Sequence, residues 1–202
     1  LGHVERFPDY WEIISDKESA TSLSAFGTDP EKNTQLDVGL IQRGAKVSTS
    51  VSLFYNDIED YILIESNVRK GMRMATIARN VDATTWGGEA GLSYTIATNW
   101  KTDLTLAYTR GENDTDDHAL AQQSPLEGRW SLNYDNGTWS AGALVRLVDD
   151  QDRYALNQGN VVGQDLGPTD GFGVLSLNGG WKIRAGVQLT AGVDNLLDET
   201  YA

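Results

Sequence analysis

The sequence predicts an all-β protein in which the strands form an antiparallel meander. Apolar and polar residues alternate with a period of two through most of the chain, and no segment shows convincing helical spacing. Short turn-forming joints alternate strictly with long polar stretches. No stretch approaches the roughly 18 uninterrupted apolar residues of a membrane-spanning helix. Together these features predict about nine strands, each antiparallel to the next.

Alternation gives each predicted strand one apolar and one polar face, because successive side chains point to opposite sides. In chain order, the alternating apolar positions are Val47, Thr49, Val51, Leu53 and Tyr55; Leu104, Leu106 and Tyr108; Trp130, Leu132 and Tyr134; Trp139, Ala141, Ala143, Val145 and Leu147; and Leu175, Leu177 and Trp181. In a membrane barrel we expect the apolar set to point outward: Val47, Val51, Leu53, Leu104, Leu106, Val145, Leu175 and Leu177. We expect the alternate set to face the lumen: Ser48, Ser50, Ser52, Ser131, Ser140 and Ser176.

The joints between the strands predict how the sheet is oriented. The short joints are residues 42–45, 98–101, 135–137 and 184–186. The long polar stretches are approximately residues 15–31, 65–79, 110–124 and 149–169. Strict alternation places every short turn at one rim and every long loop at the other, as in outer-membrane barrels. A soluble β-sandwich has no reason to enforce this asymmetry.

The aromatic residues fall into two groups that support a membrane barrel. The group beside the short turns is Tyr94, Trp100, Tyr134, Trp139 and Trp181. The group toward the long loops is Tyr61, Trp86, Tyr108, Tyr154 and Phe172. Two aromatic bands around an aliphatic zone are typical of lipid-facing strands. The alternative is that these rings are cross-strand packing partners in a soluble sheet.

Composition excludes several classes of function. The chain has 16 Lys and Arg against 29 Asp and Glu, and a net charge of −13, which argues against nucleic-acid binding. There is no Cys, so a thiolate site is excluded. His3 lies at the start of the sequence, and His118 lies in a long acidic stretch, so neither completes a catalytic triad. Asp149 and Asp150 are adjacent and point to opposite faces of a strand. The sequence therefore predicts no catalytic residues, no cofactor and no enzyme activity.

Two groups of residues are candidate metal ligands. Met72 and Met74 are the two methionines of the chain and share one polar stretch, and thioethers select Cu(I). An intervening arginine opposes a cation there, so an ordinary loop is the preferred interpretation. Asp57, Glu59 and Asp60 lie beside a strand end but lack the spacing and glycine of a calcium loop. We assign no metal site to either group, and the ligand-binding residues stay unknown.

Five segments in order resemble the TonB-dependent outer-membrane receptors. The segments are residues 26–39, similar to the "PEKS-x-x-x-E-x-G" strand; 54–62, similar to "FY-x-x-I-x-D-x-I"; 80–90, similar to "N-x-x-x-A-x-x-x-G-x-E"; 125–129, similar to "P-x-x-x-R"; and 192–201, similar to "G-x-x-N-L-F-D-x-x-Y". They cover nearly the whole chain. Residues 6–12 and 164–168 are most similar to the copper receptors of this group.

The resemblance implies a barrel of about 22 strands filled by an N-terminal plug. Residues 1–202 would form the C-terminal part of this barrel, with the plug and the final strand outside the sequence. The whole protein would import a scarce metal or metal complex, copper among them, with energy coupling through TonB. It would lie in the bacterial outer membrane, against lipid and lipopolysaccharide.

Two local expectations follow from these motifs. In the near-terminal motif, Asn195 is expected to satisfy the backbone where a strand ends, and Asp198 to cap the bend. Glu89 and Arg129 are a candidate ion pair in the lumen, although solvated charges without a special role are the preferred interpretation.

Two other classes of function stay open from the sequence. One is a passive porin-like barrel or adhesin without a plug. The other is a soluble β-sandwich that binds carbohydrate. An open sheet would leave unpaired strand edges, so we also expect its outer strands to pair with segments beyond residues 1–202.

Overall fold

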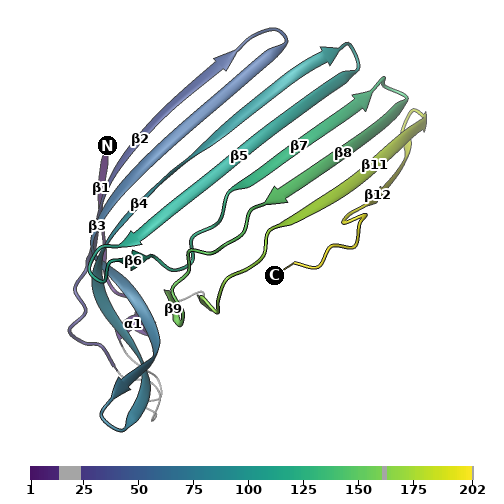
Figure 1. Ribbon diagram of the computed structural model, residues 1–202. Helices are drawn as coiled ribbons and strands as arrows, with labels where there is room; N and C mark the ends of the chain where they lie inside the picture. Colours follow the sequence, from purple (N-terminus) through teal and green to yellow (C-terminus); the bar gives the residue numbers. More distant parts are fainter. Residues whose placement is uncertain (14–23, 161–162, 202) are drawn as a thin grey trace.

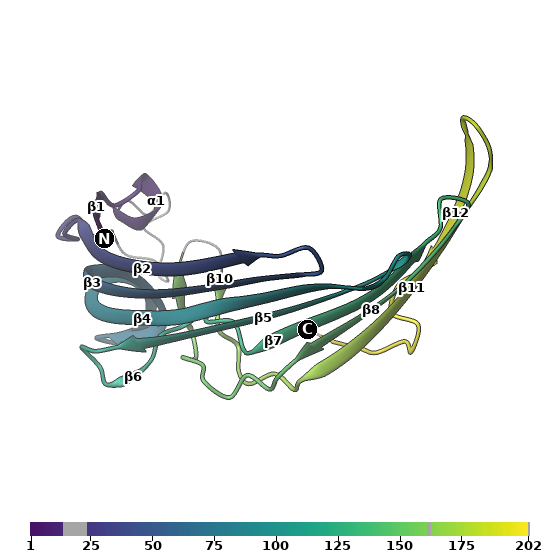
Figure 2. The same ribbon diagram turned by 90° about the horizontal axis from the view of Figure 1, so that it is seen from above.

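The computed structural model describes residues 1–13, 24–160 and 163–201. In these residues, nine strands form one antiparallel path in the order β1-β2-β3-β4-β5-β7-β8-β11-β12. The short strands β6, β9 and β10 attach to this path and complete a sheet of twelve strands. The predicted all-β meander of about nine strands is confirmed. Figures 1 and 2 show that the sheet is open and curved.

The path strands differ greatly in length. Their bounds are β1 (Gly2–Arg6), β2 (Glu31–Arg43), β3 (Val47–Lys70), β4 (Arg73–Ala97), β5 (Trp100–Asn113), β7 (Glu127–Asp135), β8 (Trp139–Val148), β11 (Phe172–Arg184) and β12 (Val187–Val193). The attached elements are β6 (His118–Ala119), β9 (Gln158–Asn160) and β10 (Gly163–Gln164), together with the single-turn helix α1 (Tyr10–Ile13). Within the described residues, no helix has the length and apolar character needed to cross a membrane.

The four short joints lie at one rim of the sheet, as predicted (Figure 1). Backbone hydrogen bonds connect neighbouring turns along this rim. Thr95 N donates to Lys46 O at 2.8 Å, and Asp135 N donates to Asn99 O at 3.0 Å. Lys182 N donates to Thr138 O at 2.8 Å. Because these bonds join each turn to the next hairpin, the turns form one continuous edge.

The strand register sorts the side chains onto two faces. Val51 is paired with Leu40 and Ala90, and Ala90 is paired with Leu106. Residues paired directly across a sheet share a face. Following this register places the whole predicted outward set on one face, here named the apolar face. The six predicted lumen-facing serines lie on the opposite side, named the polar face.

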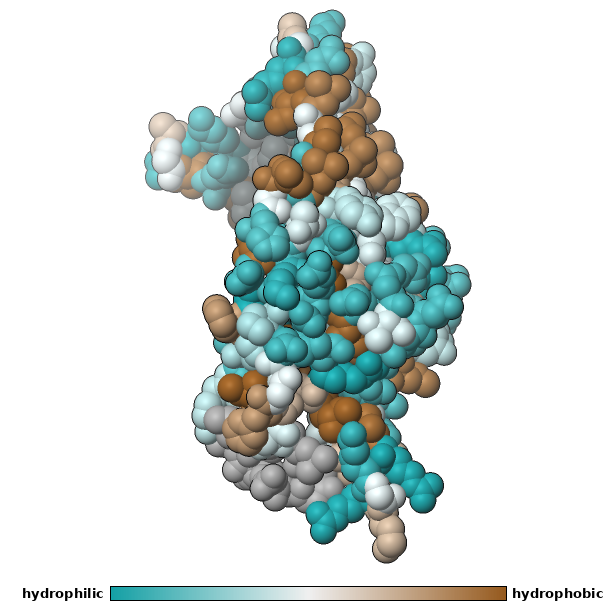
Figure 3. All heavy atoms as spheres, turned by 90° about the vertical axis from the view of Figure 1, so that its left-hand side faces the viewer, coloured by the Kyte–Doolittle hydropathy of each residue, from teal (hydrophilic) through white to brown (hydrophobic). Residues whose placement is uncertain are grey.

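The apolar face remains uncovered in the described residues. Leu53 is 57% exposed, Leu106 is 44% exposed and Val51 is 43% exposed. Figure 3 shows hydrophobic side chains gathered in the upper part of the side that faces the viewer and mainly hydrophilic ones across its middle. A soluble sandwich would pack such side chains between two sheets. The sandwich alternative is therefore wrong.

One predicted long loop is instead a β-hairpin. Residues 62–79, named the arm, continue β3 and β4 to a turn at Gly71, and the arm projects beyond the sheet (Figure 1). Ile62 and Leu63 are fully buried at its base, and this burial supports the hairpin. The prediction of a polar loop at residues 65–79 is wrong because strand pairing continues through that segment.

The other three long stretches are partly ordered as strands. Residues 110–124 contain the end of β5 and the short strand β6, and residues 149–169 contain β9 and β10. Residues 161–162 of the last stretch lie outside the described residues. In the stretch 15–31, residues 15–23 also lie outside them, and β2 begins at Glu31.

The aromatic residues confirm one band and part of the other. At the short-turn rim, Trp139 and Trp181 stack with ring centroids 5.0 Å apart, and Trp100 contacts Tyr134 at 5.0 Å. The register places the predicted rim group on the apolar face.

The second aromatic band is only partly formed. Trp86 and Tyr108 share the apolar face and contact each other edge to face at 5.7 Å. Tyr61 instead packs against the small core of Ile58, Ala83 and Leu120. Phe172 is on the polar face, because it has the strand parity of Ser176. The assignment of Tyr61 and Phe172 to a lipid-facing band is therefore wrong.

Candidate functional site

A hollow of about 490 Å³ opens on the polar face above β4, β5 and β7. Small residues form its floor, including Gly91, Thr105 and Ala107. Charged side chains stand at its sides, namely Glu89, Glu127 and Arg129. The hollow therefore offers both signs of charge over a floor that admits close approach of a bound group.

Glu127 is the centre of an ion-pair cluster on this face. Arg146 binds it through two nitrogens, with Nε donating to Oε1 at 3.1 Å and Nη2 donating to Oε2 at 2.9 Å. Arg129 Nε also donates to Glu127 Oε1. Arg146 lies over the ring of Phe172 at 5.1 Å, which fixes the guanidinium from its other side.

The candidate ion pair of Glu89 with Arg129 is not formed in the part of the chain that the structure describes. Both side chains line the same hollow, but Arg129 pairs with Glu127, two residues away on the same strand face. Glu89 is separated from β7 by Ala107 of β5, which is paired with both Glu89 and Glu127. Because β5 lies between Glu89 and Arg129, the nearer carboxylate of Glu127 is the partner of Arg129.

Asn195 organises the near-terminal motif as predicted. Its Oδ1 accepts from Glu199 N, and its Nδ2 donates to Glu199 O, both at 2.9 Å. Asp198 has a left-handed backbone with φ 53°, and its N–H donates to Asn195 O at 3.0 Å. The bend places Tyr201 against Phe172, with stacked rings 4.4 Å apart.

At the loop end, Arg79 fastens the arm to the connection after β5. Its Nε lies 3.0 Å from Glu65 Oε2, and its Nη2 pairs with Asp116. The fully buried Asn113 donates to Asp116 Oδ2 at 2.8 Å and accepts from Asp116 N at 3.1 Å. The hydrogen bond from Arg79 holds the pKa of the Asp116 carboxyl below its ordinary value.

Asp165 connects two further loop segments, which sequence reasoning missed. Its carboxylate accepts from Gln122 N at 3.1 Å and from Ala155 N at 2.9 Å. In addition, β9 pairs with β3 through Glu65 and Gln158. An aspartate in a polar stretch carries no sequence signal for such long-range contacts.

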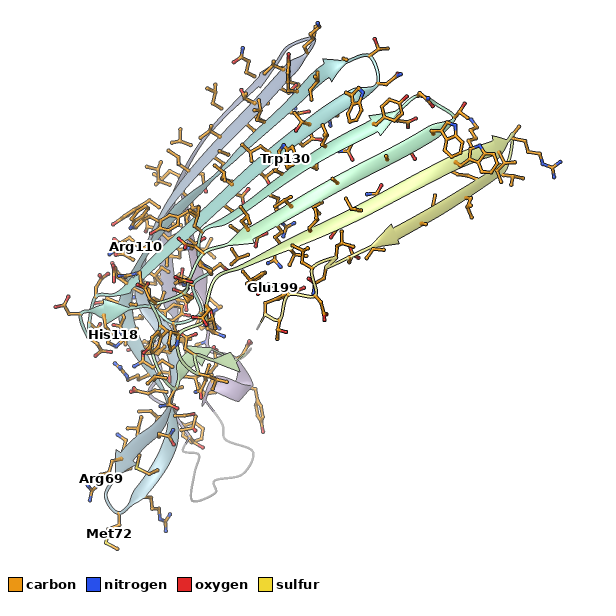
Figure 4. All side chains as sticks on the ribbon, turned by 45° about the vertical axis from the view of Figure 1, so that its right-hand side comes forward. Arg69, Met72, Arg110, His118, Trp130 and Glu199 are labelled. Atoms are coloured by element: carbon orange, nitrogen blue, oxygen red, sulfur yellow. The ribbon has the colours of Figure 1, made fainter. Side chains whose placement is uncertain are left out.

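The two candidate groups of metal ligands lie in different places, the methionines at the tip of the arm and the carboxylates on β3. Met72 lies at the turn of the arm, near Arg69 of β3, and is 99% exposed (Figure 4). Met74 on β4 is paired in register with Arg69 on β3. Asp60 pairs with Lys32 at 3.2 Å. In the described ranges, no three His, Cys, Asp or Glu side chains form a group that could hold a metal ion.

The four residues that could have formed a catalytic group make separate structural contacts. His3 Nδ1 is 3.1 Å from Thr34 Oγ1, and His118 Nδ1 is 2.8 Å from Ala119 O. Asp150 accepts from Gly171 N at 2.6 Å, and Asp149 accepts from Asp150 N at 3.0 Å. Each of these four side chains therefore has its own hydrogen-bond partner, in different parts of the sheet and loops.

The comparisons with known proteins agree with this geometry. The family model for the TonB dependent receptor-like β-barrel matches residues 1–196. Among solved structures, the chain is similar to the copper transporter OprC, with 49% identity and a TM-score of 0.89 over 99% of this chain and 31% of that chain. No curated protein sequence matches.

Two iron receptors share the fold at lower identity. A mutant of the ferric enterobactin receptor PfeA from Pseudomonas aeruginosa has 18% identity and a TM-score of 0.73 over 98% of this chain and 32% of that chain. The FrpB iron transporter from Neisseria meningitidis has 19% identity and a TM-score of 0.65 over 90% of this chain and 29% of that chain. The chain thus spans about a third of the length of these proteins. By its match to the family model and its two-faced meander, the chain belongs to the TonB-dependent receptor β-barrel family.

Proposed function

We propose that the protein carrying this chain imports a scarce metal or metal complex across the bacterial outer membrane, with copper as the first candidate. The observation that carries this proposal is the division of one continuous sheet into an apolar and a polar face. Similarity to a copper transporter at 49% identity supports the choice of metal. Iron complexes are the second candidate, since two receptors with this fold carry iron in their names.

The apolar face is proposed to contact lipid, and the polar face to line the lumen. A matched pair of substitutions on β5 tests this placement. Leu104→Arg puts a charge on the apolar face, midway between Trp100 and Tyr108, and should cost about 2–4 kcal/mol of unfolding free energy in a bilayer. Ala107→Arg puts the same charge on the polar face beside Glu89 and Glu127 and should cost far less. Urea unfolding of the receptor in vesicles measures both, and equal costs would contradict the placement.

The partners are proposed from family membership. The chain would supply wall and outer loops, while a plug and further strands of the same protein complete the receptor. TonB would drive entry, and outer-membrane lipid and lipopolysaccharide would surround the barrel. We propose a transport role without enzyme activity.

Uptake by cells tests the function directly. Cells that lack the receptor should accumulate less copper under copper limitation than cells that carry it, as measured by elemental mass spectrometry. Collapse of the proton motive force should abolish the difference, because TonB coupling needs that energy. A difference that persists without energy would favour the passive barrel. A selective loss of iron instead of copper would reject copper as the cargo.

A further inference from the structure

The end of the arm carries a cluster of positive charge, here named the basic tip (residues 69–74). Arg69, Lys70 and Arg73 lie within it, and residues 66–78 contain no Asp or Glu. In the described ranges, none of these three cations takes part in an ion pair. The chain as a whole has a net charge of −13. The basic tip is therefore opposite in sign to the protein that carries it.

The register of the basic tip brings like charges together. Lys70 is paired directly with Arg73 around the turn at Gly71, which has a φ of 65°. Like charges directly opposite each other destabilise a hairpin, and an anionic partner that contacts both relieves this repulsion. Arg69 is paired with Met74 and lies on the other face of the hairpin, because successive side chains alternate. Since the cations occupy both faces, a partner that contacts all three must surround the tip.

Met72 adds an exposed apolar side chain to the basic tip. It is 99% exposed, and Figure 4 shows it extending away from the end of the arm. An unbranched thioether side chain adapts well to irregular apolar pockets. A partner that fits the tip therefore offers an apolar pocket for Met72 and carboxylates for the cations around it.

The length of the arm separates the basic tip from the acidic loops. Arg79 pairs with Asp116 at the base of the arm, and Gly71 is eight residues from Arg79 along the chain. At about 3.3 Å per residue, a strand of this length spans about 25 Å. Exposed charges are screened beyond about 8 Å at physiological salt, so the acidic loops do not cancel the charge of the tip.

The same separation decides between classes of anionic partner. A long polyanion, such as a nucleic acid or an acidic polysaccharide, would extend from the tip onto the acidic loops, which repel it. A compact acidic protein contacts the tip alone. Burial of Ile62 and Leu63 and the ion pairs of Arg79 hold the base of the arm, so the tip is presented to a partner in a preorganised form.

We propose that the basic tip docks into an acidic hollow on an extracellular protein. Met72 enters an apolar pocket in that hollow, and Arg69, Lys70 and Arg73 contact carboxylates around it. The exposure of the tip outside the cell rests on the proposed outer-membrane placement. A tip of this size makes a small contact, so the complex is transient and its charges chiefly set the association rate.

Photo-crosslinking from the intact receptor in living cells tests the proposal. Met74 is replaced by p-benzoylphenylalanine, the cells are irradiated in their own culture medium, and the adducts are identified by mass spectrometry. The same photoactive residue in place of Leu166, which is 90% exposed in another loop-end segment, is the control position. We expect position 74 to capture a protein with an acidic surface that position 166 does not capture.

Binding of that identified protein to the purified receptor measures the role of each part of the tip. The triple variant Arg69→Glu, Lys70→Glu and Arg73→Glu should bind roughly tenfold more weakly or worse, mainly through a slower association rate. This effect should shrink in about 0.5 M NaCl, because salt screens the charges. Met72→Ser should weaken binding at both salt concentrations, since it removes an apolar contact.

A second triple variant is the matched control. Arg43→Glu, Lys46→Glu and Arg184→Glu make the same change of charge at exposed positions of the short-turn rim, and this variant should bind like the native receptor. An adduct with lipopolysaccharide or nucleic acid alone, no adduct, or equal binding by the native receptor and both triple variants would overturn the proposal. Copper uptake that stays intact alongside any of these results would leave the proposed transport function standing.

Discussion

Replacing Arg79 by methionine should loosen the arm without disturbing the sheet. The substitution keeps a long side chain but removes the guanidinium that holds Glu65 and Asp116. Both partners are partly shielded, with side chains 26% and 29% exposed, so each pair should contribute toward the upper end of the range for surface ion pairs. Two such pairs give about 1–2 kcal/mol of local stability.

Hydrogen exchange of the receptor in detergent measures this loss. A change of about 1–2 kcal/mol in local opening corresponds to exchange about 5- to 30-fold faster. The faster exchange should be confined to the paired segments of the arm and to β9, which is joined to β3 through Ile64 and Gly159. Amides in β7 and β8 should exchange at the native rate.

Arg73→Met is the matched control for this prediction. Arg73 lies in the same hairpin, is paired in register with Lys70, and has no ion pair in the described part of the chain. The control should leave exchange of the arm base unchanged. If Arg73→Met and Arg79→Met give the same exchange pattern, the ion pairs of Arg79 do not hold the arm.

Two more predictions concern the loop end and the near-terminal bend. The pKa of the Asp116 carboxyl is lowered from 3.8 in the folded protein. The ion pair of Asp116 therefore stabilises the folded protein fully above about pH 3.8, and this stabilisation is lost as the pH falls toward the lower, folded-state pKa. Hydrogen exchange of the arm amides should therefore stay slow at pH 5 and accelerate only below about pH 3.8. Faster exchange of the arm already at pH 5 would contradict this prediction. Asn195→Ala removes both hydrogen bonds to Glu199 and should speed exchange of the Glu199 amide about tenfold. Asn195→Asp keeps the acceptor and should retain part of the protection, whereas equal rates in both variants would contradict the assigned acceptor role.

The faces and rims of the sheet could be predicted because they depend on local rules. Strand parity decides the face of Leu104 and Ser131, and turn chemistry decides the rim of residues 135–137. The strand parity that Phe172 shares with Ser176 also predicts the polar face for Phe172, and this parity outweighs its nearness to the loops.

Other features depend on contacts that a single sequence does not display. The face of Tyr61 is altered by a register shift between Ile58 and Tyr61, where Asp60 takes a left-handed backbone with φ 57°. The arm looks polar along its sequence, yet its stability derives from burial at its base, from the ion pair between Arg79 and Glu65 within the arm, and from the ion pair of Arg79 with Asp116, 37 residues along the chain. Arg129 pairs with Glu127 and not with Glu89 because Glu127 lies on the same face of the same strand, whereas β5 separates Glu89 from Arg129.

The nearest-neighbour order of the meander has a consequence for how the wall assembles. Each hairpin from β2 to β5 pairs with the segment that immediately precedes it, so every addition closes only a short loop of chain. The pairing of Ile64 with Gly159 is different, since it encloses β4, β5, β7 and β8 within one loop. Such a distant contact has a larger entropic cost of loop closure, and this cost falls once the intervening strands are already paired. The strands of the sheet should therefore pair one after another along the chain. The pairing of β9 with the arm should be among the last folding steps.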